Sequence, residues 1–200
     1  MDKIPTIQTP RLTLRAISKQ DAKAVFEYAR RKEVGPSAGW NPHVTIKETE
    51  TFIQYALTKQ KRSQPGVWVI CEKQRDRAIG SIEVHSYEGY KGEIGFVLHP
   101  DYWNRGYITE AAEAVMVYAF ERMKLKRLAY AHFLDNDASA RVCKKLGFTV
   151  EGVRRKGFMH EDGRILDEIV ASFTYEDYYS VHKDRFAQIR THLVFERDQG

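Results

Sequence analysis

The sequence predicts a mixed α/β domain of the α+β kind, with antiparallel strands that continue into a strand–helix–strand crossover. Three strand-like segments at 67–71, 79–87 and 93–98 are joined by short connections, which is typical of an antiparallel meander. The hydrophobic period then changes to that of a helix over about residues 109–122, and a further strand follows at 128–134. A chain of 200 residues, 42% hydrophobic and 30% charged, suits one globular domain.

The N-terminal part is predicted to contain a strand and two helices. Residues 12–15 alternate apolar and polar side chains, as a short strand does. A Ser/Thr-x-x-Asp/Glu pattern, which predicts a helix start, occurs at 18–21 and again at 45–48. Between the two helices, residues 35–42 include two glycines, two prolines and Trp40. This composition predicts a loop.

The C-terminal part is predicted to contain a helix, two strands and a polar tail. The helix covers 138–146 and ends at a glycine, as many helices do. Residues 148–151 and 166–173 supply the last strands. We expect one domain over residues 1–180. The extension over 181–200 is polar with apolar residues at helical intervals, so we expect it to be helical.

Composition and charge exclude several classes of function. Lys and Arg outnumber Asp and Glu by 32 to 27, and this net charge of +5 is mild beside that of a dedicated nucleic-acid binder. No apolar run approaches the roughly 20 residues of a membrane helix. The two cysteines are too few for a disulfide scaffold or a cysteine-rich zinc site, which fits a reducing compartment. We expect a cytoplasmic protein without a metal, a nucleic-acid partner or a membrane partner.

The segment over residues 99–111 lies between a strand end and a helix start. Free backbone N–H groups and the positive end of the helix dipole favour an anion at such a place. Gly106 allows the backbone to approach a ligand closely, and Arg105 adds a positive charge. A second helix start, at Asn136, follows the next strand. A turn glycine beside a solvated arginine is the alternative reading of this loop. Glu110 is expected to stabilise the helix dipole.

Four motifs carry a resemblance to a known family. They read TPRLxLR from residue 9, PxYWxRGYxTEA from residue 100, NxxSxRVxxKLGF from residue 136 and GRxxD from residue 163. The sequence resembles the GNAT superfamily of N-acetyltransferases, and within it the branch of the ribosomal-protein N-terminal (Rim-type) acetyltransferases. The resemblance spans about residues 7–180. It implies a mixed, twisted, mostly antiparallel sheet of about six or seven strands flanked by about four helices, followed by the helical tail.

The resemblance also implies acetyl-CoA as the co-substrate. The amides of residues 104–109 would hold its pyrophosphate, and pantetheine would pair like an added strand with the 93–98 strand where that strand separates from the next. The implied coenzyme contacts are Phe96, Val97, Leu98, Asn104, Arg105, Gly106, Tyr107, Ile108, Thr109, Asn136 and Ser139. Asn104 stands where the family usually has glycine, and Ile108 where it has alanine. Asparagine tolerates positive φ well, so we expect the first change to be mild.

Acetyl transfer requires help for the amine, the carbonyl oxygen and the leaving thiolate. An amine with a pKa of about 10.4 must lose a proton, and the developing oxyanion needs a donor. By resemblance, a backbone N–H near Phe96 or Val97 is that donor. Many enzymes of the family use a tyrosine as the acid, and this sequence has Cys143 at that position. Ser139 becomes the candidate acid, with a cap of its own helix as the alternative.

Glu93 is the candidate base, because it begins the strand that would carry the acetyl carbonyl. Glu83 and His85 share a face of the preceding strand and are the alternatives for this role. A solvated charge at a strand end is the other interpretation of Glu93. Trp40 lies in the loop that borders the acceptor site in this family.

The acceptor remains open between several amines. A protein N-terminus is favoured by the branch resemblance alone, and a small amine, a polyamine or an antibiotic are alternatives. The basic net charge argues slightly against polycations. A non-catalytic acyl-CoA-binding module is an alternative of another class, because the usual tyrosine is missing. We expect a monomer or a homodimer.

Overall fold

The computed structural model describes residues 4–61 and 65–196, and in this part of the chain nine strands form one open sheet. The strands are β1 (Thr6–Gln8), β2 (Leu12–Ala16), β3 (Val67–Glu72), β4 (Ala78–His85), β5 (Lys91–Leu98), β6 (Arg127–Phe133), β7 (Thr149–Met159), β8 (Ile165–Thr174) and β9 (Val194–Glu196). Five α-helices accompany them in the same residues. They are α1 (Ala22–Ala29), α2 (Ile46–Lys61), α3 (Tyr107–Glu121), α4 (Asp137–Leu146) and α5 (Lys183–Thr191).

The sheet is mixed and mostly antiparallel, which confirms the predicted class. Its strand order is β7-β8-β6-β5-β4-β3-β2-β1-β9. Every neighbouring pair is antiparallel except β5 and β6, which run parallel. Helix α3 makes the crossover between these two strands, because a parallel pair cannot be joined by a hairpin.

The strand count exceeds the predicted six or seven. The added strands, β1 and β9, have three residues each and pair with each other at one edge of the sheet. Strand β7 extends far beyond the predicted 148–151, to Met159. It is an edge strand, largely exposed, with register shifts, and its middle includes the basic residues 154–156. Such a segment lacks the alternation by which half-buried strands are recognised.

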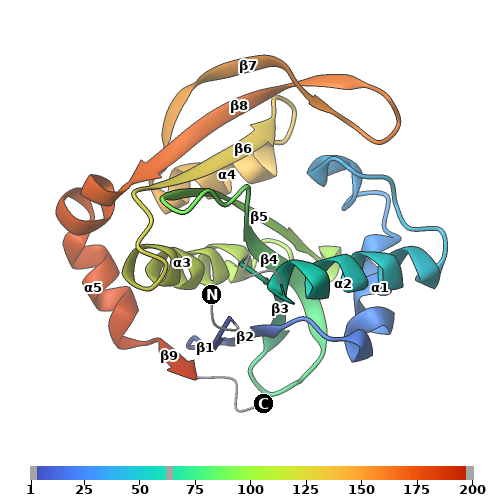
Figure 1. The fold of residues 1–200 in the computed structure, drawn as a ribbon, viewed down its shortest axis with the longest axis horizontal. Helices are drawn as coiled ribbons and strands as arrows, with labels where there is room; N and C mark the ends of the chain where they lie inside the picture. Colours follow the sequence, from blue (N-terminus) through green and yellow to red (C-terminus); the bar gives the residue numbers. More distant parts are fainter. Residues whose placement is uncertain (1–3, 62–64, 197–200) are drawn as a thin grey trace.

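Two hydrophobic clusters form the core, one on each face of the sheet. The alternation along β3 separates them: Val67, Val69 and Cys71 pack in the cluster that includes α1 and α2, and Trp68 and Ile70 pack in the cluster that includes α3 and α4. All five side chains are buried. In Figure 1 the β7–β8 hairpin arches over one end of the molecule, and its turn approaches the segment between α1 and α2.

The C-terminal segment packs on the same sheet. Helix α5 carries the buried Phe186, and Leu193 is buried just before β9 pairs with β1. Residues 1–3 and 197–200, which belong to the two segments predicted at 1–180 and 181–200, lie outside the described residues. Within the described ranges, no helix is long and apolar enough to cross a membrane.

Candidate active site

A large cleft opens where β5 and β6 separate. The two strands pair only at their beginnings, from Lys91–Arg127 to Glu93–Ala129. Beyond Glu93, β5 stays paired with β4 up to Leu98, and β6 stays paired with β8 up to Phe133. The cleft that results has a volume of about 1410 Å³. A gap beside an unpaired strand side is where an extended ligand can add main-chain hydrogen bonds.

The loop before α3 forms one wall of this cleft. Asn104 has φ of 60° and Gly106 has φ of 77°, so both lie in the left-handed region. For Asn104 this confirms the predicted conformation. Among the described residues, no acceptor takes a hydrogen bond from the N–H groups of residues 104–109. These free donors, together with the positive end of the α3 dipole, suit an anionic group.

The predicted loop residues line the cleft with one exception. Asn104, Gly106, Tyr107, Ile108 and Thr109 all line it, and Arg105 does not. The Arg105 guanidinium donates to the carbonyl of Asp101 at 2.8 Å and lies 5.2 Å from the centre of the Tyr102 ring. In this conformation the Arg105 side chain does not face the cleft.

Strand β5 forms the floor. Phe96, Val97 and Leu98, the residues of this strand named as coenzyme contacts by resemblance, all line the cleft. The Leu98 carbonyl already accepts a hydrogen bond from the indole N–H of Trp103 at 2.8 Å. The Phe96 ring lies 5.8 Å from the ring of Tyr130 on β6, so these two aromatic side chains face each other where the strands separate.

Asn136 and Ser139 lie at the start of α4, on the opposite side of the cleft. The Asn136 Oδ1 caps the helix by accepting from the Ser139 N–H at 3.0 Å, and its Nδ2 donates to the Ser37 carbonyl at 3.2 Å. The Ser139 hydroxyl lies 2.7 Å from the hydroxyl of Tyr130, which also donates to the Ser139 carbonyl at 3.0 Å. The capping role considered for Ser139 therefore belongs to Asn136, and the Ser139 hydroxyl pairs with a phenol.

Cys143 faces away from the cleft. It is buried in the cluster under α4 and is absent from the residues that line the cleft. Burial raises the pKa of its thiol to about 11. A neutral thiol in the core behaves as a small apolar side chain.

The candidate base and its two alternatives lie on one face of the sheet. Glu83 pairs with Gly95, and His85 pairs with Glu93, across β4 and β5. The Glu93 carboxylate is 3.9 Å from His85 Nε2, whereas the Glu83 carboxylate is held by Lys59 of α2 at 3.0 Å. Gly95 leaves room for the His85 ring, which a β-carbon there would approach to 3.1 Å. Within the described residues, Glu93 thus has no lysine or arginine partner.

Comparison with known proteins decides the family. Residues 11–149 match the family described as the acetyltransferase (GNAT) domain. The chain belongs to the GNAT acetyltransferase family. It is 34% identical over 173 residues to the uncharacterized N-acetyltransferase YoaA of Bacillus subtilis, covering 84% of this chain and 96% of YoaA. The crystal structure of a GNAT acetyltransferase from Bacillus anthracis is 29% identical, with a TM-score of 0.76 over 86% of this chain and 99% of that one.

Two more distant GNAT proteins have names that state an acceptor. The spermidine N(1)-acetyltransferase of Escherichia coli K12 is 26% identical over 85% of this chain and 89% of its own length. The ribosomal-protein-S5-alanine acetyltransferase of Vibrio fischeri is 22% identical, and its crystal structure matches with a TM-score of 0.70 over 86% of this chain and 97% of that one. The second likeness shows a shared fold.

The far end of this GNAT cleft is closed by the α1–α2 loop and the β7–β8 hairpin. Trp40 lies 5.1 Å from the ring of His43, and both line the cleft. The Asn41 N–H donates to the Glu161 carboxylate of the hairpin turn at 2.8 Å. The Phe158 ring of β7 packs against Gly39 of the same loop, where an added β-carbon would overlap the ring. Burial lowers the pKa of His43, and the carboxylates of Glu48 in α2 and Glu161 in the hairpin turn oppose that shift.

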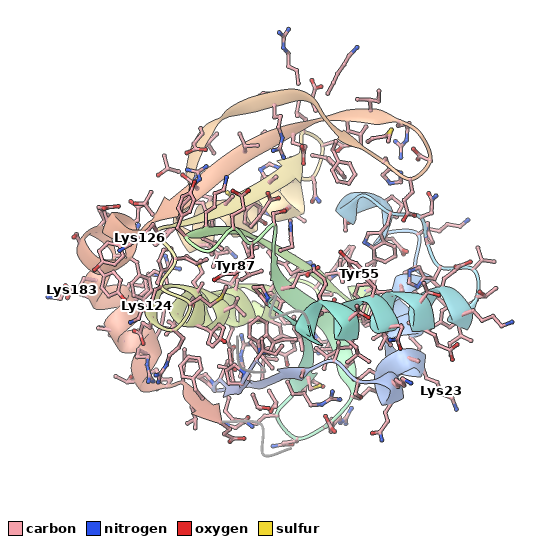
Figure 2. All side chains as sticks on the ribbon, in the orientation of Figure 1. Lys23, Tyr55, Tyr87, Lys124, Lys126 and Lys183 are labelled. Carbon is pink, nitrogen blue, oxygen red and sulfur yellow. The ribbon has the colours of Figure 1, made fainter. Side chains whose placement is uncertain are left out.

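The charge of the cleft differs from the charge of the whole chain. Five carboxylates line it, namely Glu48, Glu83, Glu93, Glu161 and Glu168, whereas among the described residues its lysine and arginine lining is limited to Arg141 and Lys145 on α4. Lys124, Lys126 and Lys183 gather at the left of Figure 2, whereas Tyr55, which lines the cleft, lies right of the centre. Two of these carboxylates are paired with cations, Glu83 with Lys59 and Glu168 with Arg154. The field that an acceptor meets thus depends on local charges more than on the net charge of the chain.

One residue of the site, Tyr130, and the partners of Glu110 escaped the sequence analysis. Tyr130, which pairs with Ser139, has the strand periodicity of a core residue and carries no motif of its own. Glu110, expected to act on the helix dipole, is bonded to Thr9 and Arg11 of the N-terminal motif. The proximity of these pairs depends on tertiary structure.

In the described residues, no group of three His, Cys, Asp or Glu side chains is arranged to hold a metal ion.

Proposed function

We propose that this GNAT protein transfers the acetyl group of acetyl-CoA to a primary amine by direct attack of the amine. The observation that supports this most is the separation of β5 from β6 beside a loop whose six N–H groups, those of residues 104–109, have no acceptor among the described residues. An extended thioester arm suits the first feature, and a diphosphate suits the second. The amine nitrogen bonds to the carbonyl carbon, the carbon–sulfur bond breaks, and coenzyme A leaves as its thiolate, which then takes a proton from solvent.

Each step has a candidate group on a different wall of the cleft. Glu93 removes the proton of the amine, directly or through water, and has no competing lysine or arginine among the described residues. A backbone N–H at Phe96 or Val97 stabilises the developing charge on the carbonyl oxygen. Ser139 donates a hydrogen bond to the leaving thiolate from the opposite wall, supported by Tyr130 at 2.7 Å. The sequence has no obvious covalent nucleophile for a two-step route.

The α-amino group of a protein is the acceptor we propose. Support comes from the four motifs that resemble those of the ribosomal-protein branch and from the volume of the cleft, which at about 1410 Å³ leaves room for an acceptor beside a coenzyme arm. A polyamine is a second candidate. The carboxylates of the cleft favour it, because they attract a chain with several ammonium groups, and one relative is a spermidine acetyltransferase.

One experiment separates these acceptors. The purified protein is incubated with acetyl-CoA and either a short peptide with a free α-amino group, the same peptide already N-acetylated, or spermidine. Mass spectrometry then locates any added acetyl group. We expect the free peptide to gain one acetyl group at its N-terminus and the blocked peptide to gain none.

Other outcomes point to the alternatives. Acetylated spermidine with an unmodified peptide would replace the peptide by the polyamine as acceptor. Tight binding of acetyl-CoA with no product from these amines or from a cell extract would favour a non-catalytic acyl-CoA-binding module.

A further inference from the structure

The N-terminal segment Thr9-Pro10-Arg11 is hydrogen-bonded to the first turn of α3. The carboxylate of Glu110 accepts three hydrogen bonds from it: from the Thr9 hydroxyl at 2.6 Å, from the Arg11 N–H at 2.9 Å and from Arg11 Nε at 2.6 Å. Thr9 is buried, and Glu110 is largely buried with 15% of its side chain exposed. The turn between β1 and β2 is therefore held against the helix whose N-terminus lines the cleft.

Arg11 also holds the loop itself. Its Nη1 donates to the Arg105 carbonyl at 2.9 Å, and its guanidinium lies 4.8 Å from the centre of the Tyr107 ring. In a planar trans peptide, the carbonyl of one residue and the N–H of the next point in opposite directions. The hydrogen bond to the Arg105 carbonyl therefore orients the Gly106 N–H away from Arg11, and Gly106 lines the cleft.

The charge of Arg11 matters as well as its hydrogen bonds. Glu110 places a carboxylate in the first turn of α3, where it competes with any anionic ligand for the positive end of the helix dipole. The charge-assisted pair with Arg11 at 2.6 Å offsets that carboxylate. Without Arg11, a diphosphate at the loop would face an uncompensated negative charge.

We propose that Arg11 is a positioning residue of the coenzyme site, which aims the N–H groups of the 104–109 loop and neutralises Glu110. This inference rests on the proposed function, because it assigns the loop to a diphosphate. It gives the segment Thr9-Pro10-Arg11 a role in coenzyme binding, although Arg11 precedes Arg105 of the loop by 94 residues in the sequence.

The test measures ligand affinity by calorimetry in the wild-type protein and four variants. The ligands are coenzyme A and S-acetylpantetheine, which lacks the nucleotide and the diphosphate. The variants are Arg11→Ala, Arg11→Lys, the double variant Arg11→Ala with Glu110→Gln, and Arg15→Ala. Arg15 is the matched control, because it lies on the same strand, β2, and is bonded to Asp21 and Asp76 instead of the loop. Circular dichroism establishes that each variant is folded.

We expect Arg11→Ala to weaken coenzyme A binding about tenfold, the effect of losing a hydrogen bond from a charged group. Arg11→Lys should fall between it and the wild type, since the charge stays and the fork of donors is lost. The double variant should bind coenzyme A about threefold more tightly than Arg11→Ala, because the competing carboxylate is gone. Arg15→Ala should leave this affinity unchanged, and S-acetylpantetheine should bind all variants alike.

Two results would overturn the inference alone, while coenzyme A still binds the wild-type protein. The first is an unchanged coenzyme A affinity in folded Arg11→Ala. The second is an equal loss for coenzyme A and S-acetylpantetheine, which would mean general damage to the cleft. Failure of the wild-type protein to bind coenzyme A would instead overturn the proposed function together with this inference.

Discussion

The hydroxyl of Tyr130 on β6 lies 2.7 Å from the hydroxyl of Ser139 on α4. Tyr130 is buried, and burial raises the pKa of its phenol well above the ordinary range. Neither such a phenol nor the aliphatic hydroxyl of Ser139 gives up its proton to a thiolate, whose thiol has a reference pKa of about 8.5, so both act as hydrogen-bond donors. The phenol has one proton and two acceptors on Ser139, the carbonyl and the hydroxyl; when it donates to the hydroxyl, the serine proton is available for a hydrogen bond to the leaving thiolate.

Replacing Ser139 should therefore slow turnover without weakening the binding of coenzyme A. We expect Ser139→Ala to lower kcat about 10²-fold, the usual effect of removing one hydrogen-bond donor to a developing charge, with an unchanged dissociation constant for coenzyme A. Tyr130→Phe keeps the ring and should lower kcat less than Ser139→Ala. Steady-state kinetics and calorimetry check both. Equal turnover of Ser139→Ala and the wild type would remove Ser139 from the mechanism.

The role of Glu93 makes a prediction about pH. Glu93→Gln should lower kcat about 10²-fold near neutral pH. The deficit should shrink as the pH rises through the pKa of the proposed acceptor, about 7.7–8.0 for a protein α-amino group, because more of the amine is then already deprotonated. Rates measured from pH 6 to pH 10 check this. Glu83→Gln is the comparison, and a larger loss in that variant would transfer the role of base to Glu83.

The left-handed conformation of Gly106 allows a comparison with Gly89. Both glycines have φ of 77°, but Gly89 has open space around it, whereas a β-carbon at Gly106 would lie 3.4 Å from the Arg11 guanidinium. Each change to alanine should destabilise the fold by about 1 kcal/mol through backbone strain. We expect Gly106→Ala to weaken coenzyme A binding by about tenfold as well. Thermal unfolding and calorimetry measure the two effects, and equal coenzyme affinity in both variants would contradict the assignment of the loop.

The buried thiols should be unreactive in the folded protein. Burial raises the pKa of Cys143 to about 11 and that of Cys71 to about 12. Because the thiolate is the nucleophile, Ellman's reagent at pH 8 should label both far more slowly in the folded protein than in guanidinium chloride. Labelling should accelerate as the pH rises toward 11. Rapid labelling of native Cys143 at pH 8 would show that its thiol reaches the cleft.

Local chemistry was sufficient for a large part of this site. Asn136 caps α4, and Asn104 adopts positive φ, because a short amide side chain favours both conformations wherever it occurs. The helix α3 begins just after Gly106, where a glycine-containing turn follows a strand. These features depend on a few neighbouring residues, so the order of the elements, the loop and the family resemblance were all accessible from the chain alone.

Long-range contacts were decided by tertiary structure. Strands β1 and β9 have three residues each and are stabilised by pairing with each other across most of the chain length. The bond of Arg11 to Glu110, the partner of Ser139, and the turning of the Arg105 side chain away from the cleft each join or separate residues that no local pattern connects. The carboxylate lining of the cleft collects side chains from different elements, so its sign differs from the net charge of the chain. The electrostatic field at the cleft depends on the distances between charged groups, and these distances are set only by the tertiary structure.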